Sequence, residues 1–125
     1  MQDEPRAAEI LPAIAKFLRE TVTTDHSAHT IFQARVAANA ADLAAREAQL
    51  SPKFDAEEQV RLQSLLGVTG DLLVLNRILA DRIAEGAMTL ETPGLKAHLW
   101  ANSLAKLAVD QPSYASYRRA LKRRG

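Results

Sequence analysis

Six polar residues have the types and helical spacing that could form a site for a negatively charged ligand. They are Arg35, Asn39, Asn76, His98, Lys106 and Asp110. Arginine and lysine bind carboxylates and phosphates, and side-chain amides can complete the hydrogen bonding of such a ligand. The sequence thus allows a polar pocket between helices. The alternative is a filled network of hydrogen bonds that fixes how the helices pack.

Three asparagines bear on this choice, because each lies at or near an apolar stripe of its predicted helix. They are Asn39, Asn76 and Asn102. A buried amide without a partner costs about 1 to 3 kcal/mol, so each amide must find one. On the same helices, Arg35 is close to Asn39 and Lys106 is close to Asn102. We predict that Arg35, Asn39 and Asn76 belong to one connected network.

Metal and catalytic motifs are few. His26 and His29 lie three residues apart at the start of a predicted helix and could hold a metal with His98 as a third ligand. Such a pair is common by chance, and neither a fixed third ligand nor a base accompanies it, so we predict no metal and no cofactor. The sequence has no glycine-rich phosphate loop, nucleophile elbow or Glu-x-x-His pair. These features favour a protein that is not an enzyme.

The elements that carry these residues are all predicted to be helices, because apolar residues recur every three or four positions between capping signals. The expected helices cover residues 4–22, 28–50, 55–66, 71–85, 93–110 and, as a short last helix, 113–122. Pro12 should kink the first helix or restart it. The sequence predicts an all-α fold, a compact bundle of five main helices plus a short C-terminal helix, in a single domain of residues 1–125.

The helix over residues 28–50 has two different sides. Its apolar stripe is formed by Phe32, Val36, Leu43 and Leu50, and alanines cover much of the opposite side. Those alanines are Ala34, Ala37, Ala41, Ala44, Ala45 and Ala48. Small side chains let another helix come close, which predicts an intrachain contact or a homodimer interface. We prefer the homodimer, since closed two-fold assemblies are the commonest. The helix over residues 71–85 is apolar over most of its circumference and is expected inside, and Trp100 is expected to pack inward.

Composition and charge restrict the partners and the cellular location expected of the protein. The chain has 125 residues, no cysteine and a net charge of +1. Five of the 16 basic residues fall in residues 118–125, which hold no acid and are expected to form a solvated, frayed end. No basic stripe continues onto the rest of the chain, which argues against a nucleic-acid partner. The polar start MQDEPR and the lack of a long apolar run predict a cytoplasmic protein without a membrane segment.

Three fragments carry a resemblance to a known family: HTIFQARVAANAADLAARE, GDLLVLNRILADRI and LKAHLWANSLAKLAVDQPSY. The chain resembles a family of short, all-helical bacterial proteins of unknown function, associated with aminoglycoside-phosphotransferase-like kinases and acyl-CoA dehydrogenases. Recurrent elements of that family fall on Arg35, Asn39, Gly70, Asp71, Leu75, Asn76, His98, Lys106, Asp110, Pro112 and Tyr114. The chain departs from the pattern at Ser113, where an arginine is expected, and at Pro12.

Two function classes follow. The first, which we favour, is a non-catalytic helical accessory or protein-interaction protein whose partner, by the resemblance, is a kinase-like or acyl-CoA dehydrogenase-like enzyme. The second is a binder of an anionic small molecule, or an unrecognised enzyme, that uses the six polar residues. An enclosed pocket lined by those residues would favour the second class, and a filled polar core would favour the first.

Overall fold

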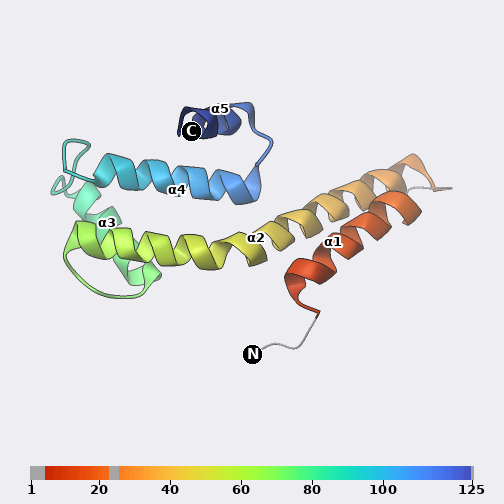
Figure 1. Ribbon diagram of the computed structural model, residues 1–125, viewed down its shortest axis with the longest axis horizontal. Helices are drawn as coiled ribbons and strands as arrows, with labels where there is room; N and C mark the ends of the chain where they lie inside the picture. The colour runs from red at the N-terminus through yellow and green to blue at the C-terminus, as the bar shows by residue number, and fades with distance from the viewer. Residues whose placement is uncertain (1–4, 23–25, 125) are drawn as a thin grey trace. The chain divides into compact units, whose positions relative to one another are not determined.

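In the computed structural model, which describes residues 5–22 and 26–124, all the regular structure is helical (Figure 1). The helices are α1 (Ala7–Phe17), α2 (Ala28–Leu66), α3 (Leu72–Ala84), α4 (Leu95–Asp110) and α5 (Ala115–Arg124), and a π-helical turn, η1 (Leu18–Val22), continues α1. The all-α class is therefore confirmed. The predicted start of the first helix at residue 4 lies outside the described residues. Within the described ranges, no helix is both long and apolar enough to cross a bilayer.

The chain divides into two compact units, and the boundary between them falls within α2. The N-terminal unit, Met1–Ser51, contains α1, η1 and the first part of α2. The C-terminal unit, Pro52–Gly125, contains the rest of α2 together with α3, α4 and α5.

Both internal prolines are accommodated within helices. The predicted break at Ser51-Pro52 is wrong, because α2 runs without interruption from Ala28 to Leu66. A proline at position 52 frees the carbonyl of Ala48, and both residues are exposed, so water can satisfy that carbonyl. Likewise, α1 begins at Ala7 and passes through the exposed Pro12 instead of restarting there.

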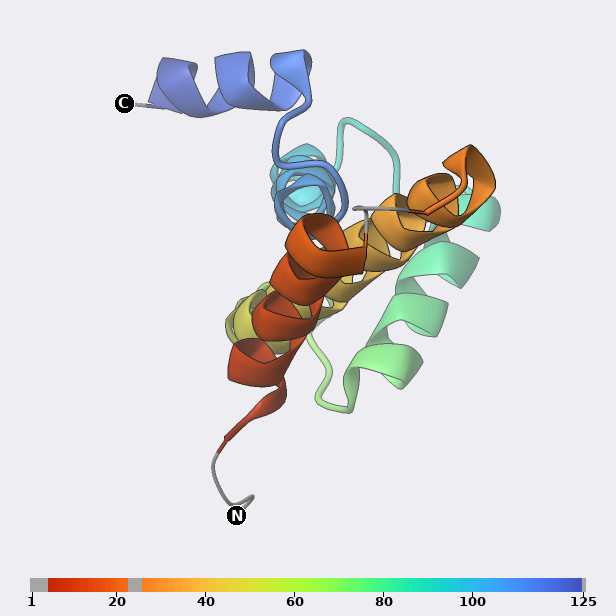
Figure 2. The same ribbon diagram turned by 90° about the vertical axis from the view of Figure 1, so that its right-hand side faces the viewer.

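The N-terminal unit buries part of the predicted alanine side of α2, since Ala34, Ala41 and Ala45 are buried while Ala37 and Ala48 are exposed. Ala38 and Ala41 form a small core with Ala15 of α1, and Leu11 and Leu18 pack against it. Both views show α1 running alongside this part of α2 (Figures 1 and 2). The alanine side therefore makes an intrachain contact, which was one of its two predicted uses.

The predicted apolar stripe of the same segment lies on the outside. Phe32 is 66% exposed, and Val36 and Leu43 are also exposed. The large side chains of this stripe therefore do not form the core of the N-terminal unit. Small alanine side chains allow two helix backbones to approach closely, and α1 packs on that side instead.

The C-terminal unit has a leucine core. Its buried members are Leu62, Leu66, Leu75, Leu79, Met88 and Leu95. The helix expected over residues 71–85 is found as α3 and is capped at both ends: Asp71 Oδ1 accepts a hydrogen bond from the backbone N–H of Val74 at 2.9 Å, and Gly86, just past the helix, has a positive φ of 76°. The prediction that α3 is buried all round is wrong, because Leu73 is 66% exposed.

Two hydrogen bonds hold the end of α2 and the loop that follows it. Arg82 Nη1 of α3 donates to the carbonyl of Leu66 at 3.0 Å, which satisfies one of the free carbonyls at the end of α2. Gln59 Nε2 donates to the carbonyl of Gly70 at 2.8 Å. These contacts fix α3 against α2 and so position the polar side chains that lie between the helices.

Candidate functional site

Five polar side chains from three helices of the C-terminal unit meet in one group, here called the polar cluster. Glu58 and Arg61 come from α2, Asn76 from α3, and His98 and Asn102 from α4. Their hydrogen bonds run between helices, so the polar cluster joins α2, α3 and α4.

Asn102 is the centre of the polar cluster. Its Oδ1 accepts from Arg61 Nη2 at 2.7 Å, and its Nδ2 donates to Glu58 Oε1 at 3.0 Å. The same Nδ2 lies 3.2 Å from His98 Nε2. An amide nitrogen carries two hydrogens and accepts none, so it can serve both neighbours at once. Both polar atoms of the Asn102 side chain are thus hydrogen-bonded.

Glu58 links the other two helices. Its Oε1 accepts from Asn76 Nδ2 at 2.9 Å as well as from Asn102. Asn76 Nδ2 also donates to the carbonyl of Leu72, at 3.1 Å. A single carboxylate oxygen therefore connects α2 to both α3 and α4. The predicted start of a separate helix at residue 55 is wrong, because Asp55 and Glu58 both lie inside the continuous helix α2.

His98 is a buried neutral imidazole. Its exposed fraction is 2%, and Nε2 faces a donor, the amide of Asn102, so this nitrogen must be the unprotonated one. The proton then lies on Nδ1, for which the described residues provide no acceptor. Burial lowers the pKa of His98 below its ordinary value of 6.5, the positive charge of Arg61 lowers that pKa further, and Glu58 opposes both effects.

The pH dependence of stability follows from this lowered pKa. Since the pKa of His98 is lower in the folded than in the unfolded state, the unfolded state binds the proton first as the pH falls through 6.5. Protonation of His98 Nε2 also makes this nitrogen a donor, so that it faces another donor, Nδ2 of Asn102. We expect the free energy of unfolding to keep the whole contribution of neutral His98 above pH 6.5 and to decrease below that pH. Urea denaturation at several pH values measures this dependence.

The matched variants for this experiment are His98→Gln and His29→Gln. His29 is exposed, and its replacement should leave the decrease intact. His98→Gln should remove the part of the decrease that begins near pH 6.5. Identical pH profiles for the wild type and His98→Gln would contradict the assignment.

The structure brings together only two of the six predicted site residues. Asn76 and His98 belong to the polar cluster, where Glu58 and Asn102 connect them. Arg35, Lys106 and Asp110 are exposed.

Asn39 has a separate set of partners in the N-terminal unit. Its Oδ1 accepts from Arg19 Nη2 at 2.8 Å, and Arg19 also pairs with Asp42 at 2.6 Å. The predicted network of Arg35, Asn39 and Asn76 is therefore wrong in its membership, because Asn39 and Asn76 bond to different partners in different units.

Sequence reasoning missed Glu58 and Arg61. A signal for both was present, since Glu58, Arg61, Leu62 and Leu65 follow the spacing of one helix face. A carboxylate and a guanidinium that share a face with buried leucines need polar partners from neighbouring helices. The amides of Asn76 and Asn102 are those partners.

The weak metal candidates lie on the surface. His26 and His29 are both exposed, while His98 is bonded within the polar cluster. Over residues 5–22 and 26–124, no group of three or more histidine, aspartate or glutamate side chains is placed to hold a metal ion.

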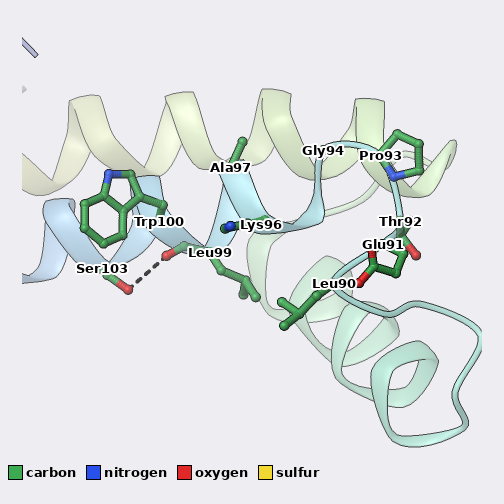
Figure 3. Close-up of a pocket in the computed structure, with 10 residues that line it drawn as sticks. All are labelled: Leu90, Glu91, Thr92, Pro93, Gly94, Lys96, Ala97, Leu99, Trp100 and Ser103. Atoms are coloured by element: carbon green, nitrogen blue, oxygen red, sulfur yellow. Dashed lines mark hydrogen bonds between the residues drawn. The ribbon is translucent and has the colours of Figure 1, made fainter.

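A second feature of the C-terminal unit is an apolar groove at the start of α4, here called the Trp100 groove (Figure 3). It is lined by Leu90, Glu91, Thr92, Pro93, Gly94, Lys96, Ala97, Leu99, Trp100 and Ser103 and has a volume of about 720 Å³. Leu90 and Leu99 project toward one another in it (Figure 3). Trp100 is 55% exposed, so the prediction that it packs inward is wrong.

Comparison with known proteins gives a family and nothing more specific. A family model described as "Domain of unknown function (DUF6285)" matches residues 24–114, a range that includes both the polar cluster and the Trp100 groove. Neither the curated proteins nor the solved structures gave a significant match.

Proposed function

Because the chain belongs to the DUF6285 family, whose function is unknown, we propose a function from its geometry: a non-catalytic helical protein that binds a partner protein through the Trp100 groove. In this proposal the polar cluster has a structural role and binds no ligand. Its amides and its carboxylate are bonded to one another, and His98 is buried, which supports the filled polar core expected of an interaction protein.

The observation that carries the proposal is the exposure of Trp100. It is the only tryptophan of the chain, and more than half of its side chain is open to solvent beside the exposed Leu90 and Leu99. Apolar side chains gathered on one surface are typical of interaction sites, and tryptophan often dominates the binding energy of such sites.

The occupant that fits the Trp100 groove is an apolar segment of another protein. The charged residues that line it are Glu91 and Lys96, which have opposite signs, so the groove has no net charge to attract a nucleic acid or an anionic lipid surface. The resemblance found in the sequence supplies the candidate partners, a kinase-like or an acyl-CoA dehydrogenase-like enzyme of a bacterial cytoplasm. In this proposal the whole chain acts as one helical domain, arranged as a bundle.

A homodimer is not part of the proposal. The argument for it rested on the alanine side of residues 28–50, and α1 packs on that side within the same chain.

The test compares affinity capture by the wild type, Trp100→Ala and Leu73→Ala from a lysate of the native host, with identification by mass spectrometry. Leu73 is a matched control, because it is an exposed apolar residue of the same unit outside the groove. We expect the wild type and Leu73→Ala to retain a kinase-like or dehydrogenase-like enzyme and Trp100→Ala to lose it. Equal retention by all three proteins would exclude the Trp100 groove as the contact surface.

A further inference from the structure

A second pocket of the C-terminal unit, here called the α5 pocket, lies among α2, α4 and α5. Its lining includes Glu57, Arg61, Ala105, Leu104, Leu121 and Arg124, and its volume is about 520 Å³. Pockets of a few hundred cubic ångströms are the usual size for small-molecule ligands. The alanines and leucines form an apolar wall, and the charged residues give the α5 pocket a polar end.

Arg61 is the unusual member of this lining. Its Nη2 donates to the neutral amide of Asn102, and the nearby carboxylate of Glu58 accepts its hydrogen bonds from Asn76 and Asn102 instead. Arg61 Nε is buried and has no hydrogen-bond partner among the described residues. Nε is closed off from solvent, so an anion in the α5 pocket would meet the Nη groups, of which only Nη2 has a hydrogen-bond partner among the described residues.

The effect of Arg61 on its neighbour agrees with this reading. Arg61 lowers the pKa of His98 by its positive charge, second only to burial. The guanidinium of Arg61 therefore lies close enough to His98 for its charge to act on the imidazole.

The charge balance of the lining indicates the class of ligand. Arg61 and Arg124 supply two positive charges and Glu57 supplies one negative charge, so the α5 pocket favours an anion of single charge. An apolar wall beside the cationic end favours a ligand with an apolar body.

We propose that the α5 pocket binds a small organic carboxylate with an apolar body, whose carboxylate meets Arg61 and whose chain lies along the alanines of α4. The α5 pocket shares only Ala97 with the lining of the Trp100 groove, so this proposal does not depend on the proposed partner. It also differs from the six-residue anion site expected from the sequence, since none of those six residues lines it.

The test is a titration of the full chain with octanoate, followed by backbone amide shifts in nuclear magnetic resonance spectra. We expect saturable shifts at the residues of α4 and α5 that line the α5 pocket. Octylamine and inorganic phosphate, which lack the carboxylate and the apolar body respectively, should not produce them. Equal shifts with octylamine or with phosphate would overturn the proposal, as would octanoate shifts confined to the indole N–H of Trp100.

Two variants of the α5 pocket sharpen the test. Arg61→Gln should weaken octanoate binding about tenfold, the loss expected when a charge-assisted hydrogen bond is removed. Ala105→Leu should weaken it by a similar factor by filling the cavity without touching the polar cluster, so it serves even if Arg61→Gln fails to fold. Lys96→Gln, outside the α5 pocket, should bind like the wild type. Unchanged binding by Ala105→Leu would refute the location.

Discussion

Replacing Asn102 with alanine is expected to lower the free energy of unfolding by about 3 kcal/mol, because the buried His98 and two partly buried charged groups lose a partner together. Arg61 Nη2 loses its acceptor, His98 Nε2 loses its donor, and Glu58 Oε1 keeps only one of its two amide bonds. Chemical denaturation at pH 7.5, where His98 is neutral, measures the loss.

Ser103→Ala is the matched control for Asn102→Ala. Ser103 is the next residue of α4, is exposed, and donates only to the carbonyl of Leu99, at 2.9 Å. Both substitutions raise helix propensity by about 0.5 kcal/mol, so their difference isolates the polar cluster. Similar small effects of the two changes would mean that Asn102 is solvated and that the polar cluster does not hold the helices together.

Ala38→Leu is expected to cost about 3 kcal/mol in the N-terminal unit, near the upper end for overpacking. Ala38 is 0% exposed and lies in the small core with Ala15 of α1, so a larger side chain there forces the two helices apart. Hydrogen exchange of the α1 amides reports the effect directly, because α1 should lose protection when it no longer packs on α2.

The control for this change is Ala37→Leu. It makes the same substitution one residue earlier, at an exposed position of α2. It should change the free energy of unfolding by less than ~0.5 kcal/mol and leave the protection of α1 intact. Loss of protection in Ala37→Leu with none in Ala38→Leu would contradict the packing of α1 on the side of α2 that holds Ala38 and Ala41.

The helices themselves were largely predictable, because their signals are local. Asp71, Gly67 and Gly86 mark helix ends by capping chemistry that depends only on nearby backbone groups. The break at Pro52 was not a safe inference, since its cost depends on whether water reaches the freed carbonyl of Ala48. That is a property of the folded surface.

The side of each helix that faces its neighbour was harder to predict. Periodicity identifies two faces of residues 28–50, and the rule that larger apolar residues go inside selects the wrong one. In the structure Ala34, Ala41 and Ala45 of the alanine side are buried, because close helix packing favours small side chains, and Phe32 remains exposed.

The polar cluster shows the same limit. The sequence marks Asn76, His98 and Asn102 as polar residues at or near packing surfaces, but their partners Glu58 and Arg61 come from another helix. Pairing across helices depends on how the helices are placed side by side, which spacing within one helix cannot give. The same-helix partners suggested for Asn39 and Asn102 were wrong for this reason.

The proposed role of the Trp100 groove is tested most directly by the accessibility of Trp100. Because the chain has one tryptophan, acrylamide quenching of its fluorescence reports on this groove alone. In the complex, the purified partner is used with its own tryptophans replaced, or with their emission resolved from that of Trp100. Our account predicts ready quenching in the free protein, protection in the complex, and no complex with Trp100→Ala. A stable complex in which Trp100 is quenched as readily as in the free protein would contradict it.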